Sequence, residues 1–409
     1  MASAIEEKKK SYSACEPLAA SEVRLVWIES FQWCANNAVY FLGLIGSATY
    51  DLRADAFVIA AITLVRNLAD SLANAAAGPV VDRNGPRRTA LCILAFVTVI
   101  GIVMGVLPPS VPSLVVAAVA LGLGAGAINT VTRTYPAYLV SGKDKLAQLN
   151  GSMVFWSDIA FTVGPLAGAA LVGRFPTRYV YFFMATCTAL AFCVALGCRE
   201  VIVPEHAEDE RIGMLSGMAE GARCVFSTRR LRVLFLAGFL GFFAFGAFDS
   251  LESLYYRDVL RVDAVWLGIL SAVSGVGSSV GAWVLSRLDE RHVTMRLLLA
   301  SLFFVGVGSI VYVCSDVLAI AFVGQAITGL AWGVEEPVES VLVQDATPLA
   351  YMGRVMGFIR LGLMSAGVLP LLVAPFLAEL IGPQAVLLGA SCVIALMGAF
   401  FYLRYRDLD

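Results

Sequence analysis

The chain has 409 residues, of which 59% are hydrophobic and only 15% are charged. A typical soluble protein carries about 25% charged residues, so these proportions exclude an ordinary water-soluble fold. The 29 Lys and Arg residues and 31 Asp and Glu residues give a formal net charge of -2, and no basic excess indicates nucleic acid as a partner.

The cysteines and histidines offer little material for a metal site or for catalysis. Nine cysteines are scattered singly, mostly through apolar segments, without the spacing of metal ligands, and are expected to act as small hydrophobic residues. Only two histidines occur, His206 and His292, and they lie far apart in polar stretches. We therefore expect no metal, no cofactor and no enzymatic activity.

Twelve segments are apolar and long enough to cross a membrane. A helix that spans the hydrocarbon core needs about 20 mostly apolar residues, because its backbone groups must bond within the helix. In chain order the segments are Leu25–Ile45, Ala56–Ala77, Thr89–Leu107, Pro112–Val131, Gly151–Val172, Tyr179–Leu196, Leu231–Tyr255, Ala264–Leu285, Met295–Cys314, Val317–Leu342, Val355–Leu377 and Gln384–Leu403. The sequence thus predicts an all-α integral membrane protein with twelve transmembrane helices in two six-helix halves.

Lysine and arginine are concentrated in one set of alternate loops. The set that includes both termini holds most of them. The opposite set holds five, namely Arg53, Arg174, Arg178, Arg257 and Arg261. Because basic residues accumulate in cytoplasmic loops, both termini should be cytoplasmic. No cleavage pattern for a signal peptide follows the polar first residues, so we expect a multi-pass protein of the cell membrane.

The chain divides at its longest polar connection, residues 199–230. The expected parts are a cytoplasmic N-terminal tail (1–24), an N-terminal six-helix half (25–198), this linker (199–230), a C-terminal six-helix half (231–404) and a cytoplasmic C-terminal tail (405–409). Within the linker, Met214–Phe226 has apolar residues at helical spacing. This pattern predicts either a helix lying on the cytoplasmic surface or a solvated linker helix.

Polar residues recur along one face of the first two spans. An ionisable side chain inside a membrane is costly and is therefore a functional candidate by default. The pattern comprises Glu29, Gln32, Asn36 and Tyr40 in the first span and Thr63, Arg66, Asp70 and Asn74 in the second. Asn36, Tyr40 and Asp70 are candidates for the wall of a substrate cavity. Arg66 and Asp70 either form an intrahelical ion pair or face that cavity.

The loop after the second span carries the motif Gly78-Pro-Val-Val-Asp82-Arg83-Asn-Gly85-Pro86-Arg87-Arg88. Gly78 lets helices approach closely, Asp82 suits a helix N-terminus or an arginine, and Gly85 permits a tight turn. The motif resembles the loop signature of the major facilitator superfamily, with Pro86 in place of one arginine. The resemblance implies transport by alternating access and a gating role for Gly78, Asp82, Arg83, Gly85, Arg87 and Arg88.

A motif in the fifth span resembles one branch of this superfamily in particular. Gly164-Pro165-Leu-Ala-Gly168-Ala169 is similar to a helix-kink motif of proton-driven drug antiporters. The stretch from Glu220 to Arg232 resembles the macrolide-efflux and siderophore-export branch. The alternative for Gly164, Pro165 and Gly168 is an ordinary kink with small-residue packing. In the fourth span, Ala120 stands where the best-known drug antiporters carry an arginine, which is a departure from that pattern.

Further candidates lie in the fifth and seventh spans. Asp158 precedes Thr162 by one turn, and Trp156 lies beside it. In the seventh span a stripe comprises Phe242, Phe245, Asp249, Glu252 and Tyr256. Asp158 and Asp249 are candidate proton-coupling acids, and Trp156 and Phe245 are candidates for an aromatic cavity wall. Glu252 either lines the cavity or reaches the membrane surface and is solvated.

The tenth span holds the densest cluster of acids. Gln325, Thr328, Trp332, Glu335 or Glu336, and Glu339 recur at steps of three and four residues and share one helical face. Gln325 and Trp332 are assigned to the substrate cavity. Glu335, Glu336 and Glu339 are the preferred proton-coupling site, because three carboxylates so close cannot all ionise comfortably. In the alternative, Glu339 is solvated or paired with Arg354 or Arg360, and the other two bond neighbouring helices.

These features predict a secondary active transporter that exports a moderately apolar small molecule, driven by inward proton flow. A drug, a macrolide-like compound or a siderophore is the expected substrate, and direction and substrate follow mainly from the resemblance. The alternatives are a proton-coupled solute importer, a membrane receptor or assembly factor that transports nothing, and a lipid flippase. The expected partners are the small-molecule substrate, protons and the lipid bilayer, with the protein as a monomer.

Overall fold

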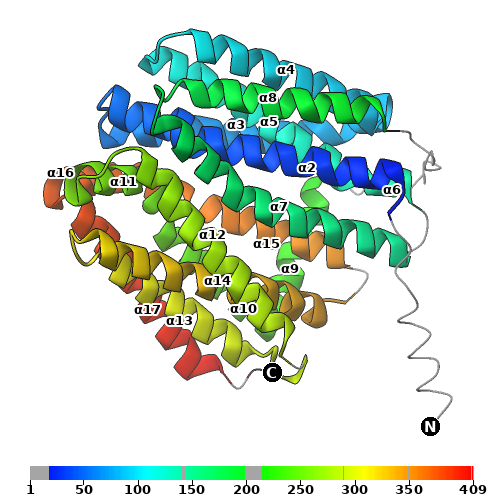
Figure 1. Cartoon of the computed structure of the whole chain (residues 1–409). Helices are drawn as coiled ribbons and strands as arrows, with labels where there is room; N and C mark the ends of the chain where they lie inside the picture. The colour runs from blue at the N-terminus through cyan, green and yellow to red at the C-terminus, as the bar shows by residue number, and fades with distance from the viewer. Residues whose placement is uncertain are drawn as a thin grey trace.

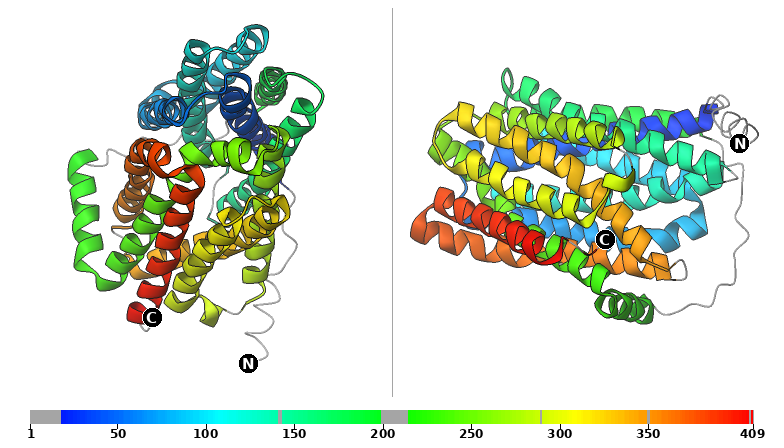
Figure 2. Two further views of the ribbon diagram at one scale, coloured as in Figure 1. Left: turned by 90° about the vertical axis from the view of Figure 1, so that its left-hand side faces the viewer. Right: turned by 90° about the horizontal axis from the view of Figure 1, so that it is seen from below.

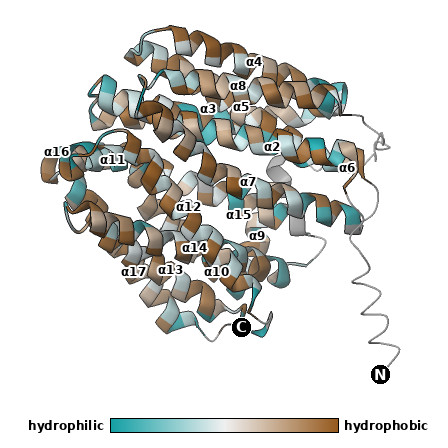
Figure 3. Cartoon of the chain, viewed as in Figure 1, coloured by the Kyte–Doolittle hydropathy of each residue, from teal (hydrophilic) through white to brown (hydrophobic). Residues whose placement is uncertain are grey.

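The computed structural model describes residues 18–140, 143–198, 214–288, 290–348, 351–406 and 408. These residues form helices joined by short connections, and no strand occurs among them (Figure 1). Apolar residues run along the helices, whereas hydrophilic residues gather mainly at helix ends and in connections (Figure 3). The predicted all-α membrane architecture is confirmed.

The N-terminal half forms the upper bundle in Figure 1. Its helices are α2 (Ala20–Ala38), η1 (Val39–Asp51), α3 (Ala56–Asn84), α4 (Pro86–Val106), α5 (Val111–Thr134), α6 (Pro136–Leu139), α7 (Lys143–Val172) and α8 (Tyr179–Leu196). Glycines set the closest contacts, because a Cβ atom on Gly122 or Gly126 of α5 would overlap the backbone of α3. These two helices therefore pack backbone against backbone.

The C-terminal half forms the lower bundle. Its helices are α9 (Met214–Ser227), α10 (Arg229–Phe245), α11 (Phe248–Leu254), η2 (Tyr255–Leu260), α12 (Val265–Ser286), η3 (Glu290–His292), α13 (Met295–Val313), α14 (Leu318–Ala346), α15 (Met352–Ala366), α16 (Val368–Ile381) and α17 (Pro383–Tyr405). Gly329 and Gly333 of α14 lie against the backbone of Ser274 and Ser278 of α12. Both halves thus use glycine to bring one helix pair into direct backbone contact.

Eleven described segments are long and apolar enough to cross a membrane, and they correspond to the second to twelfth predicted spans. The first predicted span corresponds to α2 and η1. Four of the described spans are interrupted. The first changes to a π-helix at Val39, the fourth consists of α5 and α6, the seventh consists of α10, α11 and η2, and the eleventh divides between α15 and α16 at Gly367. Such breaks in otherwise regular helices often mark functional positions.

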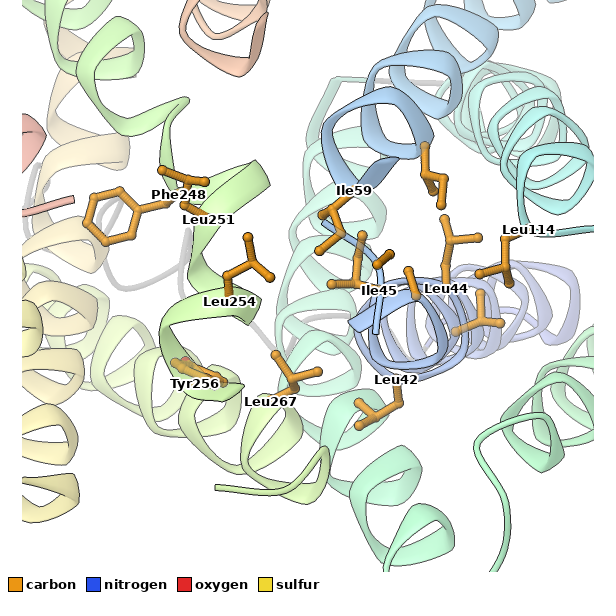
Figure 4. Packing of buried hydrophobic residues seen from close by; sticks show 14 of the residues in the cluster. Leu42, Leu44, Ile45, Ile59, Leu114, Phe248, Leu251, Leu254, Tyr256 and Leu267 are labelled. Carbon is orange, nitrogen blue, oxygen red and sulfur yellow. The ribbon is translucent and has the colours of Figure 1, made fainter. Parts of the chain in front are cut away.

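The two halves meet through apolar side chains at one end of the molecule, which we call the closed end. One buried cluster there includes Leu42, Ile45 and Ile59 of the N-terminal half and Leu251 and Leu254 of the C-terminal half. Figure 4 shows these residues on neighbouring helices of the two halves. Burial of apolar area therefore holds this end together.

Hydrogen bonds reinforce the closed end. Nη1 of Arg257 in η2 donates to the backbone oxygens of Thr49 at 3.1 Å and Ala54 at 2.9 Å. The hydroxyl of Thr49 donates to Oγ of Ser253 at 2.9 Å. All three bonds cross from one half to the other. The two π-helical segments, η1 and η2, thus contribute to the contact between the halves.

Away from the closed end, each half has its own apolar core. Leu25, Leu94 and Val131 belong to a cluster built within the N-terminal half. Leu299 and Val355 belong to another cluster, built within the C-terminal half. We call this side, where α2 begins and α17 ends, the terminal end (Figure 1). Among the described residues, no apolar cluster joins the halves there.

Helix α9 lies where the linker helix is predicted and packs on α15 at the edge of the bundle (Figure 2). Glu220 forms an ion pair with Arg354 of α15. A Cβ atom on Gly221 would overlap the Arg354 carbonyl, and Val225 is completely buried. One face of α9 is therefore docked on the C-terminal half, and the choice between a helix on the cytoplasmic surface and a solvated linker helix concerns its other faces.

Candidate functional site

Arg66 of α3 is a cation held by neutral groups inside the bundle. Its Nη2 donates to Oδ1 of Asn36 in α2 at 3.2 Å, and its Nη1 donates to Oδ1 of Asn67 at 3.3 Å. The guanidinium carbon lies 4.6 Å from the centre of the Tyr40 ring, which is a cation–π contact. The predicted cavity residues Asn36 and Tyr40 therefore meet at one cation.

Asp70, one turn along α3, does not complete the predicted intrahelical pair. No ion pair within 4.0 Å joins it to Arg66 in the described chain. The contacts of Arg66 with Asn36 and Tyr40 direct its guanidinium towards α2 and η1 instead. Asp70 still interacts electrostatically with Arg66, and also with Arg360 of α15 in the other half. The direct ion pair is therefore not formed, and the two side chains interact at longer range.

Asp249 of α11 brings a negative charge to the same region from the C-terminal half. Its side chain has exposed surface, although it lies within a predicted membrane span. It interacts electrostatically with Arg66 and Tyr40 of the N-terminal half. An acid of one half therefore lies within electrostatic range of an arginine of the other.

Glu252, one turn further along α11, lies in a hydrogen-bond network rather than at a solvated surface. Its Oε1 lies within hydrogen-bond distance of the hydroxyl of Tyr312 at 2.7 Å, Nε2 of Gln325 at 3.1 Å and the hydroxyl of Tyr256 at 3.3 Å. The two hydroxyl oxygens lie 2.5 Å apart and share two protons, so two of the three contacts among these hydroxyls and Oε1 are hydrogen bonds at one time. The solvated alternative is wrong, because the side chain points back into its own half, where α13 and α14 supply donors. Gln325, assigned to a cavity by sequence, is a partner of this carboxyl group.

The polar face predicted for the tenth span is present on α14, but it points into the interior of the C-terminal half. Trp332 contacts Phe245 with ring centres 4.7 Å apart, and Glu335 is only 8% exposed. Both line a cavity of about 10 Å³ between α10, α13, α14 and α17, which has room for about one water molecule. Oε1 of Glu339 is buried without a hydrogen-bond partner, close to Gly238 of α10. This face therefore contributes to the interior of one half.

The alternative pairing of Glu339 with Arg354 is wrong. Arg354 forms its ion pair with Glu220 of α9. No ion pair joins Glu339 to Arg360 in the part of the chain that the structure describes. Arg354, which the sequence suggested as a partner of Glu339 in α14, is thus paired with helix α9 instead.

Glu336 lies on a different face of α14 from Glu335 and Glu339. It is exposed, and it interacts electrostatically with Asp158 of α7, which is also exposed. The structure therefore divides the predicted acidic cluster. One glutamate is exposed and lies within electrostatic range of an acid of the N-terminal half, and two lie inside the C-terminal half.

The predicted aromatic residues do not form one wall. The ring centres of Phe245 and Phe248 lie 4.8 Å apart, and Phe245 also contacts Trp332. All three residues belong to the C-terminal half. Trp156 of α7 is 42% exposed and contacts Trp27 of α2, with ring centres 5.9 Å apart. These are two separate groups, one in each half.

The loop signature forms the predicted tight turn. Gly85 ends α3 with φ of 78°, a conformation that favours glycine, and Pro86 begins α4. Arg87 donates to the carbonyl oxygens of Leu196 at 2.6 Å and Ala195 at 3.4 Å, at the end of α8. The arginine therefore caps a neighbouring helix.

The remaining residues of the signature are less closely packed. Arg83 and Arg88 are exposed, and the side chain of Asp82 lies outside the described part of the structure. A Cβ atom on Gly78 would meet no atom within 4 Å. The close helix approach predicted at Gly78 is therefore absent here, where the halves share no apolar core.

The predicted kink motif packs α7 against three other elements. A Cβ atom on Gly164 would overlap the Cys34 backbone of α2, and one on Gly168 would lie 3.2 Å from Leu42 of η1. On another face, Pro165 of α7 lies against Gly268 of α12, in the other half. Helix α7 continues through Pro165 to Val172. The motif therefore lies where α7 meets both its own half and the opposite one.

Sequence reasoning missed the partners that arise from long-range packing. Arg257 was noticed only as one of five arginines on the less basic side, and Tyr312 and Ser253 were not singled out. The positive-φ residue Arg261 directly after η2 marks an irregular end to this span, which a regular helical pattern does not indicate. Among the described residues, no group of three or more His, Cys, Asp or Glu could hold a metal ion.

Comparison with known proteins identifies relatives over most of the chain. The family model described as Major Facilitator Superfamily matches residues 30–370. The multidrug efflux pump Tap of Mycolicibacterium fortuitum is 27% identical over 358 residues, covering 81% of this chain and 84% of the relative. Tap of Mycobacterium tuberculosis strain H37Rv is 27% identical over 304 residues, covering 72% of this chain and 71% of the relative.

Solved structures share the fold. A variant of the nucleoside transporter NupG superposes with a TM-score of 0.78 at 12% identity, covering 94% of this chain and 100% of the other. The peptide transporter POT in complex with sulfate gives a TM-score of 0.75 at 13% identity, covering 97% of this chain and 96% of the other. At these identities the likeness concerns the arrangement of helices.

Proposed function

Because the chain belongs to the Major Facilitator Superfamily, we propose that it exports a moderately apolar small molecule by alternating access between its two halves. The observation that supports this most is the asymmetry of the bundle. Among the described residues the halves share an apolar core at the closed end only, while Asp249 interacts electrostatically with Arg66 of the other half. The names of the Tap relatives support export of several compounds. The transporter acts as a monomer, since one chain supplies both halves.

The terminal end faces the cytoplasm in this proposal. The excess of Lys and Arg in the loops on that side supports this orientation. We expect a cysteine replacing Pro109, in the connection from α4 to α5, to react with a membrane-impermeant thiol reagent added to intact cells. Cysteines replacing Lys143 and Glu208, the latter outside the described residues, should be shielded, and all three need a background without native cysteines. Labelling at Glu208 but not at Pro109 would reverse the orientation.

Protons flowing inward drive the proposed export. Wild-type protein in inside-out membrane vesicles should accumulate the fluorescent dye ethidium when the lumen is made more acidic than the medium. Collapse of the pH gradient should release the dye. Accumulation only in right-side-out vesicles would instead favour the importer alternative, and dye transport insensitive to the gradient would contradict proton coupling.

Glu336 is the α14 acid best placed for this coupling. Two carboxylates repel each other when both are ionised, and a proton on either removes the repulsion between Glu336 and Asp158. Of the single glutamine variants at Glu335, Glu336 and Glu339, Glu336→Gln should reduce pH-driven ethidium uptake most, because Glu336 alone of the three interacts electrostatically with an acid of the other half. Equal uptake by all three variants and wild type would remove α14 from the coupling mechanism.

A further inference from the structure

The carboxyl group of Glu252 is held asymmetrically. Oε1 lies within hydrogen-bond distance of Tyr312, Tyr256 and Gln325. No hydrogen bond joins Oε2 to another described residue, since the three contacts of the carboxyl group all go to Oε1. Oε1 is therefore held by neighbouring donors, and Oε2 is left to bind a proton.

The surroundings of Glu252 supply donors but no contacting cation. Tyr312 is 2% exposed and Tyr256 is 1% exposed, so water does not replace their hydrogen bonds. The ionisable groups around the carboxyl are these two tyrosines, Asp249 on the same helix, and Tyr40 of η1, which interacts with both acids. Arg66 of α3 interacts electrostatically with Asp249. The Glu252 carboxyl thus has neutral hydrogen-bonding neighbours and an acidic neighbour.

Access to Glu252 differs on its two sides. Towards the terminal end, the next turn of α11 carries Asp249, which is exposed. Towards the closed end, the following residues Leu254 and Tyr255 are 5% and 0% exposed and belong to the apolar cluster shared by the halves. In this conformation the exposed neighbour of Glu252 is therefore Asp249, and the residues on its other side are buried.

We propose that Glu252 is a proton-binding site of the transport cycle, which takes up the transported proton on Oε2 while Tyr312, Tyr256 and Gln325 hold Oε1. The step is reversible binding of one proton to one carboxylate, with no other bond made or broken. This inference rests on proton-driven export as the function, and it names an acid additional to Glu336.

The position of Glu252 connects the proton to the contact between the halves. Ser253, the next residue, accepts the inter-half hydrogen bond from Thr49. Tyr255 donates to the carbonyl oxygens of Tyr312 and Ser315, at 2.9 and 2.7 Å, which fixes η2 to the end of α13. A change in the charge of Glu252 therefore acts on the same short segment that closes the molecule.

The first test detects the proton itself and requires no substrate. Infrared difference spectra of the purified full chain, recorded between acidic and neutral pH, should contain a protonated-carboxyl band that is missing in Glu252→Gln. Glu379→Gln, which removes an exposed acid of α16, is the matched control and should keep the band. Tyr312→Phe should keep the band but make it persist to more alkaline pH, because the ionised form loses its shortest hydrogen bond.

The second test separates this site from the function as a whole. In inside-out vesicles, Glu252→Gln should lose ethidium accumulation driven by a pH gradient but keep ethidium binding, measured by fluorescence, which also shows that it is folded. Full pH-driven accumulation by Glu252→Gln, or an unchanged infrared band, would overturn the site while leaving proton-driven export intact. Absence of pH-driven accumulation in wild type would overturn the proposed function instead.

Discussion

Replacing Arg257 with glutamine should part the two halves at the closed end. Nη1 of Arg257 makes two hydrogen bonds across the interface, to the carbonyl oxygens of Thr49 and Ala54. A hydrogen bond to a charged group contributes about 1.5–3 kcal/mol, so losing even one of the two should shift the balance between closed and open forms by at least about tenfold. A cysteine replacing the buried Leu251 should then react about tenfold faster with an impermeant maleimide added outside the cell.

The control for this prediction is Arg174→Gln, which removes an exposed arginine from the connection between α7 and α8. It should leave the labelling rate at Leu251 unchanged, because Arg174 makes no hydrogen bond across the interface in the described structure. Arg257→Lys should lie between Arg257→Gln and wild type, since lysine keeps the charge but lacks the fork of the guanidinium. A wild-type labelling rate in Arg257→Gln would mean that the apolar cluster closes this end alone.

Gly333→Ala should destabilise the C-terminal half strongly. A Cβ atom at this position of α14 would overlap the backbone of Ser278 in α12, including its carbonyl oxygen. Backbone atoms cannot rotate away as a side chain can, so the helices must separate, at a typical cost of about 1–3 kcal/mol or more. The midpoint of thermal unfolding of the purified protein, and the yield from membranes, should both fall.

Gly389→Ala in α17 provides the matched control. A Cβ atom there would meet nothing within 4 Å. Alanine also favours a helix over glycine by about 1 kcal/mol, so this variant should be as stable as wild type or slightly more stable. If Gly333→Ala and Gly389→Ala unfold at the same temperature, α12 and α14 are not in backbone contact.

Helix number and order followed from the sequence because both depend on local apolar length. The twelve predicted spans are all present as helices, including the polar first one, and Gly85 forms the turn assigned to it. The breaks within the membrane-spanning helices could not be predicted from the sequence. The break after Phe245 lies where Gly246 packs against the backbone of Gly367, more than a hundred positions further along the chain. Contacts of this kind are not encoded in the local pattern.

The site illustrates a second limit. A repeat of three and four residues shows that Gln325, Trp332, Glu335 and Glu339 share a face, but it cannot show what that face meets. Periodicity favoured the space between the halves, whereas the packing of α10 and α13 turned this face inwards. Glu336, one residue away from Glu335, faces outwards instead. The assignment of the coupling acid therefore changed with a rotation that no local pattern encodes.

The apolar character of the closed end has a thermodynamic consequence. Parting the halves there would transfer Leu42, Ile45, Leu251 and Leu254 from a dry cluster into water. Exposure of apolar surface raises the heat capacity, and hydrophobic association weakens as temperature falls. The free energy that separates the two conformations is therefore curved in temperature, and cooling favours the form in which this end is open. Temperature thus acts on the transport cycle through solvent, independently of protons and substrate.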